Sequence, residues 1–231
     1  MMKRLLITGT AVLSLLVSYA GASTSLLENG SFELSALTQS QANELERVGQ
    51  SYASLEAGST SLTGWTIGGT DIDYIRDYWV ASEGSYSLDL NGDEGAGSIS
   101  QSFDTVIGET YEVVFDMAGN PDGYQNGVDA MKSLLVSAAE DSKEFSFDTT
   151  ETNLTNMGWQ QQTWTFMATE TTTTLTFTSL ETGERDNGYG AALDNVAVYH
   201  LENTVPVPGA ILLTGIGITG LTRMRRKLRY R

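Results

Sequence analysis

Carboxylates are the side chains through which this chain could do chemistry. Its 231 residues include 29 Asp and Glu, a single His and no Cys. Thiolate nucleophiles, disulfides and thiolate or multi-histidine metal sites are therefore excluded. Two kinds of chemistry remain: acid–base work by paired carboxylates, and oxygen coordination of a hard cation such as Ca²⁺.

Two groups of acids have a spacing that could pair them. Asp71 and Asp73 alternate in a predicted strand and so share one face, while Asp89, Asp93 and Glu94 surround a predicted turn. Carboxylates roughly 5–10 Å apart can hydrolyse a glycosidic bond. However, a chain with so many acids offers such pairs by chance, and His200 has no nearby Ser partner. We therefore predict a protein without catalytic activity, and a glycoside-active enzyme is the less favoured alternative.

Aromatic rings could provide a platform for sugars, which stack on ring faces beside hydrogen-bonding Asn, Asp or Gln. Aromatic residues also dominate sandwich cores, and we expect Trp65 and Trp164 to lie in the core. The better surface candidates are flanked by charges or lie in Gly- and Asn-rich loops. They are Tyr78, Trp79, Tyr124 and Tyr189.

A cation site is a further possibility. Glu33 follows Asn29-Gly30 near the start of the predicted domain, and Asp194 opens its last strand. The first and last strands of a jelly roll are commonly neighbours, so the two carboxylates could approach each other. They could then bind a structural Ca²⁺, or they could only cap turns and accept backbone N–H bonds.

Charge divides the chain into three parts. Two basic residues lie in the first four and six in the last nine, whereas all 29 acids lie between Glu28 and Glu202. The region between the basic ends holds only five basic residues, a net charge of −24. Such a surface repels phosphate, so we predict no binding of nucleic acid.

The two ends are typical of targeting segments. Residues 1–22 have a positive start, an apolar stretch and a small-residue cleavage pattern, which predicts a secretory signal peptide. Residues 205–231 contain a proline motif, an apolar run spaced by Gly and an Arg-rich end. This pattern predicts a short transmembrane helix with the basic end on the cytoplasmic side. A plain C-terminal anchor is the alternative.

The C-terminal segment resembles the PEP-CTERM sorting signal of exported proteins of Gram-negative bacteria. The motif residues are Pro206, Pro208 and Gly209, and Val207 departs from the commonest form, which has Glu there. The resemblance implies processing by an exosortase, a membrane protease-transpeptidase. It also implies delivery to the cell envelope, the cell surface or the extracellular matrix.

Residues 23–204 predict a single all-β domain. Period-2 alternation recurs in short segments, for example at Tyr111–Met117 and Leu175–Phe177, with turn residues between the segments. An antiparallel β-sandwich of the jelly-roll type follows from this pattern. The segment 35–56 differs, because its Gln, Glu and Ala residues favour a short helix or a mobile surface insertion.

The body resembles the choice-of-anchor C family of exported bacterial proteins, which is related to a plant cell-wall domain of unknown function with a galactose-binding-like fold. The resemblance runs in order from NGSFE through GSISQSF and GETYEVVFDMAGNPDG to GYGAALDNVAVY. It implies an exported, non-catalytic protein that binds polysaccharide, and a structural Ca²⁺ held by Glu33 and Asp194. A purely structural matrix or biofilm protein without a sugar site is the alternative.

Overall fold

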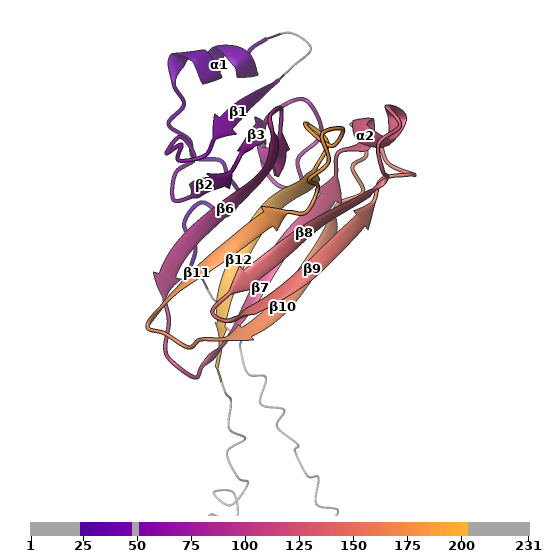
Figure 1. Ribbon diagram of the computed structural model, residues 1–231. Coiled ribbons are helices and arrows are strands. Elements are labelled where there is room, and N and C mark those ends of the chain that lie inside the picture. The colour runs from indigo at the N-terminus through magenta and orange to yellow at the C-terminus, as the bar shows by residue number, and fades with distance from the viewer. Residues whose placement is uncertain (1–23, 48–50, 203–231) are drawn as a thin grey trace, which may run out of the picture. The chain divides into compact units, whose positions relative to one another are not determined.

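The computed structural model describes residues 24–47 and 51–202, arranged as in Figure 1. Two helices and twelve strands lie among these residues. In chain order they are α1 (Gln39–Leu45), β1 (Tyr52–Glu56), β2 (Thr66–Gly69), β3 (Asp71–Ile75), β4 (Ser87–Asp89), β5 (Asn91–Gly92), β6 (Gly95–Asp104), β7 (Thr110–Gly119), α2 (Pro121–Gln125), β8 (Met131–Ala138), β9 (Asp141–Asp148), β10 (Gln160–Met167), β11 (Thr172–Ser179) and β12 (Ala191–Leu201).

The strands form two sheets that pack face to face (Figure 1). The first sheet has the order β1-β3-β4-β12-β7-β10, and the second has the order β2-β6-β11-β8-β9, with β5 paired to β6. The strand pairs with a defined register are antiparallel. The predicted all-β antiparallel sandwich is confirmed.

The core lies between the sheets because alternate residues of each strand turn inward. Phe115 of β7 meets Phe145 of β9 and Phe177 of β11, with ring centroids 5.1 Å apart in both pairs. Trp65 and Trp164 are 4% and 9% exposed, which confirms their predicted place in the core.

The N-terminal segment runs beside the last strand, as the sequence predicts for a jelly roll. The Leu26 N–H donates to the Val198 carbonyl at 2.9 Å, and the Val196 N–H donates to the Gly30 carbonyl at 2.8 Å. The residues that follow Gly30 are thereby held against the middle of the first sheet, which places Glu33 close to this sheet.

The segment 35–56 contains both a helix and a strand. Thr38 caps α1, and the Gln41 side chain reaches back to the Thr38 N–H, which together form a capping box. The helix agrees with the composition, but residues 52–56 form the edge strand β1, with Ala53 and Leu55 buried. A period-2 pattern therefore lies within a stretch whose overall composition favours a helix.

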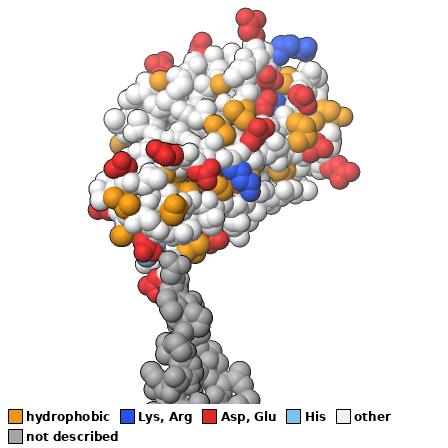
Figure 2. All heavy atoms as spheres, turned by 60° about the horizontal axis from the view of Figure 1, so that its bottom comes forward, with side chains coloured by type: hydrophobic (Ala, Val, Ile, Leu, Met, Phe, Trp, Pro, Cys, Tyr) orange, Lys and Arg blue, Asp and Glu red, His pale blue; other side chains and the backbone are white. Residues whose placement is uncertain are grey.

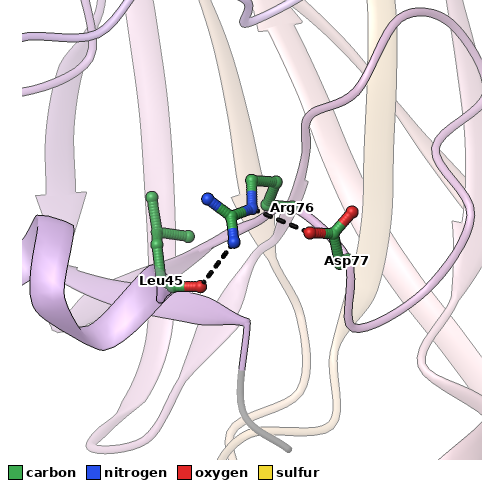
Figure 3. Close-up of polar contacts among 3 residues, drawn as sticks. All are labelled: Leu45, Arg76 and Asp77. Atoms are coloured by element: carbon green, nitrogen blue, oxygen red, sulfur yellow. Dashed lines mark hydrogen bonds and ion pairs between the residues drawn. The ribbon is translucent and has the colours of Figure 1, made fainter. Parts of the chain in front are cut away.

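Arg76 fastens α1 to the end of β3 (Figure 3). Its Nη2 donates to the Leu45 carbonyl at 3.0 Å, and its Nε pairs with Asp77 at 2.9 Å. A cation at the last turn of a helix satisfies a carbonyl that has no partner within the helix. This contact ties the helix of the segment to the strand that β1 pairs with.

The predicted signal peptide and sorting segment, including Pro206, Pro208 and Gly209, lie outside the described residues. The domain boundaries at residues 22 and 205 therefore stay predictions. Within residues 24–47 and 51–202, no helix has the length and apolar character needed to cross a membrane.

Candidate functional site

A cavity of about 120 Å³ opens on the outer side of the first sheet, beside β1, β3 and β4. Phenol rings, carboxylates and carboxamides supply most of its wall, and Ile75 and Gly188 complete it. The polar and aromatic lining residues are Tyr52, Asp73, Tyr78, Asp89, Asp93, Asn120, Asn187 and Tyr189.

Strand register brings the acids of this cavity together. Asp73 of β3 lies directly opposite Ser54 of β1 and directly opposite Asp89 of β4. Side chains that face each other in this way have Cβ atoms about 5 Å apart. Their strand neighbours Ile72, Tyr74 and Leu88 are buried on the core side, so the acids point to the other face of the sheet. Two carboxylates, both almost fully buried, thus lie side by side in the wall of the cavity.

Asp89 is held by three N–H donors. Its Oδ1 accepts from the backbone N–H groups of Asn91 and Gly190, both at 2.9 Å, and its Oδ2 accepts from Asn120 Nδ2 at 3.0 Å. Burial raises the pKa of Asp89 to about 7, although these donors and the Lys132 ammonium act to lower it. The lone pairs of Asp89 are therefore engaged in holding the surrounding loops in place.

Asp73 has fewer partners. Its side chain belongs to a residue only 3% exposed, and its Oδ1 accepts from Ser54 Oγ at 2.6 Å. Burial raises the pKa of Asp73 well above its ordinary value, and the neighbouring charges of Asp89 and Asp93 raise it further. Among the described residues, Asp73 Oδ2 has no hydrogen-bond partner, so it is available to a ligand in the cavity.

Three tyrosines surround these carboxylates. The hydroxyls of Tyr52 and Tyr78 donate to Asp93 at 3.4 Å and to Asp122 at 2.6 Å, and their rings meet edge to face at 5.5 Å. The Tyr189 hydroxyl accepts from Asn126 Nδ2 at 3.2 Å. Burial raises the pKa of Tyr52 to about 12, so this phenol stays protonated at neutral pH.

The predicted sugar-contacting residues fall into three groups. Tyr78 and Tyr189 line the cavity, whereas Tyr124 lies on α2, is 49% exposed and does not line it. The expectation that Trp79 is exposed was wrong. Trp79 is 3% exposed because its indole is buried against β4, where it donates from Nε1 to Ser87 Oγ at 2.8 Å.

Glu33 and Asp194 hold the same loop from two sides. Glu33 Oε1 accepts from the N–H groups of Ser85 and Tyr86 at 2.8 and 2.9 Å. Asp194 Oδ2 accepts from those of Ser82 and Glu83, both at 2.9 Å. In the part of the chain that the structure describes, no group of three or more His, Cys, Asp or Glu could hold a metal ion. Calcium binding by the two carboxylates stays a prediction.

Sequence reasoning missed Tyr52, Asn120 and Asn187 as members of the site. Asp73, Asp89 and Asp93 stood out by their spacing, but no local pattern predicts that β3 and β4 pair in this register. Tyr52 lies in the segment with helix-favouring composition, where only the alternation from Tyr52 to Glu56 could have indicated a strand.

Figure 2 shows one face of the molecule, on which acidic side chains are scattered and basic ones are few. Of the five basic residues in the body, Lys132 is fully buried and Arg76 is engaged by Asp77. The exposed surface is therefore strongly acidic, in agreement with the charge distribution along the chain.

Solved structures and a curated protein are similar to this chain. The structure of TmCBM61 in complex with β-1,4-galactotriose is similar to this chain, with 14% sequence identity and a TM-score of 0.43. The match covers 78% of this chain and 100% of the TmCBM61 chain. A CBM35 from Paenibacillus barcinonensis matches 64% of this chain over 98% of its own length, with 17% identity and a TM-score of 0.38. Similarities this distant say nothing about the function of this chain.

Halomucin from Haloquadratum walsbyi is 31% identical over 209 residues. The match covers 89% of this chain but 2% of halomucin, so the chain spans a small part of that relative. A family model described as a protein of unknown function (DUF642) matches residues 25–199, which is most of the chain and nearly all of its β-sandwich. The chain belongs to the DUF642 family.

Proposed function

We propose that this protein is an exported, non-catalytic component of the cell envelope or extracellular matrix that binds polysaccharide through the cavity of the first sheet. The observation that supports the proposal is the composition of the cavity: three Tyr rings beside three Asp and two Asn side chains. Ring faces stack on the apolar face of a sugar, while carboxylate and amide oxygens accept hydrogen bonds from its hydroxyls.

The size of the cavity favours a single sugar ring rather than a long groove for a chain. About 120 Å³ is well below the roughly 300–1,000 Å³ of pockets for drug-sized ligands. A polysaccharide would insert one residue, at an end or a branch, and the rest of the chain would lie over the acidic surface.

The roles of the carboxylates support binding without catalysis. A glycosidase of the common type needs one protonated acid and one ionised carboxylate free to act on either side of the bond. Asp89 has its oxygens engaged by three N–H donors, and the hydroxyl of Tyr52 engages one oxygen of Asp93. This arrangement suits groups that hold loops and position a ligand.

Export and processing belong to the same proposal and rest on the sequence. Residues 1–22 would direct secretion, and residues 205–231 would be recognised by an exosortase-type protease of a Gram-negative bacterium. A body with a net charge of −24 stays soluble outside the cell because like-charged molecules repel each other. The alternative, a structural matrix protein without a sugar site, would have the same ends and charge but no ligand for the cavity.

Replacing Tyr189 by Ala is expected to weaken glycan binding at least tenfold, which corresponds to about 1.4 kcal/mol. The loss follows because the variant removes one ring of the cavity wall. Isothermal titration with a glycan selected on an array measures the effect.

The matched control is Tyr199→Ala. Tyr199 is also partly buried, but it lies seven residues along β12 from Ala192, the register partner of Asp89, or about 23 Å from the cavity end of the strand. If both variants bind the glycan with the same affinity as the wild type, the cavity is not the binding site. Failure of the wild type to bind any glycan would favour the structural alternative.

A further inference from the structure

The cavity offers more hydrogen-bond acceptors than donors. The hydroxyl hydrogens of Tyr52 and Tyr78 are used by Asp93 and Asp122, outside or at the edge of the free space. The amide hydrogens of Asn120 are used by Asp89 and the Gly188 carbonyl. Three groups of the lining remain open toward a ligand: Asp73 Oδ2, which has no partner among the described residues, the Tyr189 hydroxyl hydrogen and the Asn187 amide. A ligand that complements this wall must be rich in donors.

The charge in the cavity has no counter-ion in its wall. Three carboxylates line it, and its lining contains no Lys, Arg or His. The Lys132 ammonium interacts electrostatically with Asp89 and Glu181, but Lys132 is fully buried beneath Gly119 and is not part of the lining. Asp73 and Asp89 therefore face each other in the cavity, while the cation that acts on Asp89 lies outside the lining.

Three rings enclose the same space. Tyr52 and Tyr78 meet at 5.5 Å, and Tyr189 completes the aromatic part of the wall. Rings arranged around a cation attract it through their negative faces. Rings and carboxylates thus favour the same kind of ligand group, a positive one with several N–H donors.

We propose that this cavity binds the free ammonium group of an amino sugar, such as an unacetylated hexosamine residue of a polysaccharide. The inference rests on the proposed function, to which it adds the class of sugar. An ammonium has three donors and no acceptor, which matches a wall of carboxylate oxygens and ring faces. The sugar hydroxyls would meet the Asn187 amide, whose side chain has no hydrogen bond within the described part of the chain. N-acetylation would remove the charge and two of the donors, and a uronate would be repelled.

The test compares three β-1,4-linked trimers, of glucosamine, N-acetylglucosamine and galactose, by isothermal titration at pH 7. The wild type is expected to bind the glucosamine trimer at least tenfold more tightly than either of the others. Asp73→Asn keeps an oxygen for Ser54 Oγ but cannot give up a proton to become a carboxylate beside a bound ammonium, so it is expected to weaken binding of the glucosamine trimer at least tenfold. Asp93→Asn changes an exposed residue of the cavity and should also weaken binding of the glucosamine trimer. It replaces Asp73→Asn in the test if that variant does not fold.

A body this acidic attracts any cationic trimer, so the matched control is Asp141→Asn. Asp141 is an exposed residue at the start of β9 in the second sheet, and the variant likewise replaces a carboxyl by an amide. Equal losses in Asp141→Asn and Asp73→Asn would show diffuse attraction and overturn the inference.

The outcomes separate the inference from the proposed function. If a neutral trimer binds as tightly as the glucosamine trimer, and Tyr189→Ala weakens it, carbohydrate binding stands and the ammonium preference is overturned. If no trimer binds, but a Lys-rich peptide does, the site recognises another amine and both proposals fall.

Discussion

The free energy of unfolding is expected to fall by several kcal/mol between pH 5 and pH 8. Burial raises the pKa of Asp89 to about 7, and it raises the pKa values of Asp73 and Asp194 as well. In the unfolded chain these acids lose their protons near pH 4. Between pH 4 and pH 7 the folded protein therefore binds more protons than the unfolded chain, so stability decreases as the pH rises.

The contribution of Asp89 alone is roughly 3 kcal/mol over this interval, since each pH unit from 5 to its pKa of about 7 corresponds to about 1.4 kcal/mol. Urea denaturation at pH 5, 6, 7 and 8 measures the slope. A stability that rises steadily over this range would contradict the burial of these acids.

The variant Asp73→Asn isolates one of these acids. It is expected to raise the free energy of unfolding at pH 8 by at least about 1 kcal/mol and to flatten the dependence on pH, because a neutral amide replaces a carboxyl that burial keeps from ionising. The exposed control Asp141→Asn should leave both quantities nearly unchanged. If the same variant also binds the ligand more weakly, Asp73 contributes to ligand binding and lowers the stability of the fold.

The second large effect is expected at Gly30, where Gly30→Ala should lower the free energy of unfolding by about 3 kcal/mol. A Cβ at this position would lie 1.8 Å from the backbone oxygen of Val196. Val196 belongs to β12, which lies inside the first sheet between β4 and β7, so neither backbone can move without breaking sheet hydrogen bonds.

Gly58→Ala separates this clash from the usual effect of replacing a glycine. Gly58 has a φ of +81° and open space around its Cα, so an alanine there should cost only about 1 kcal/mol through backbone strain. Thermal or urea unfolding of the two variants measures the difference. Equal losses would contradict the close approach of the N-terminal segment to β12.

Much of the sandwich follows from local pattern. The alternation at β7 and β11 predicts strands with one buried face. β11 has that form along its length, whereas β7 has it only up to Phe115, because the residues from Asp116 to Gly119 are buried on both faces. The segment 35–56 shows the limit of composition, since α1 forms where a capping box starts it but β1 forms where alternating residues pair with β3. Trp79 shows the limit of neighbouring charges as a sign of exposure, because the Ser87 hydroxyl and the core accept its indole.

The sequence by itself determined that this chain has an acidic β-sandwich body between two basic ends, because side-chain alternation and charge are properties that each segment carries alone. Only the tertiary structure decided which acids meet. Asp73 and Asp89 are 16 positions apart, and Tyr52 and Tyr189 are 137 apart, yet strand pairing and one loop place them around a single cavity. The physical reason is register: moving β3 by one residue against β4 would turn Asp73 to the opposite face and leave no site.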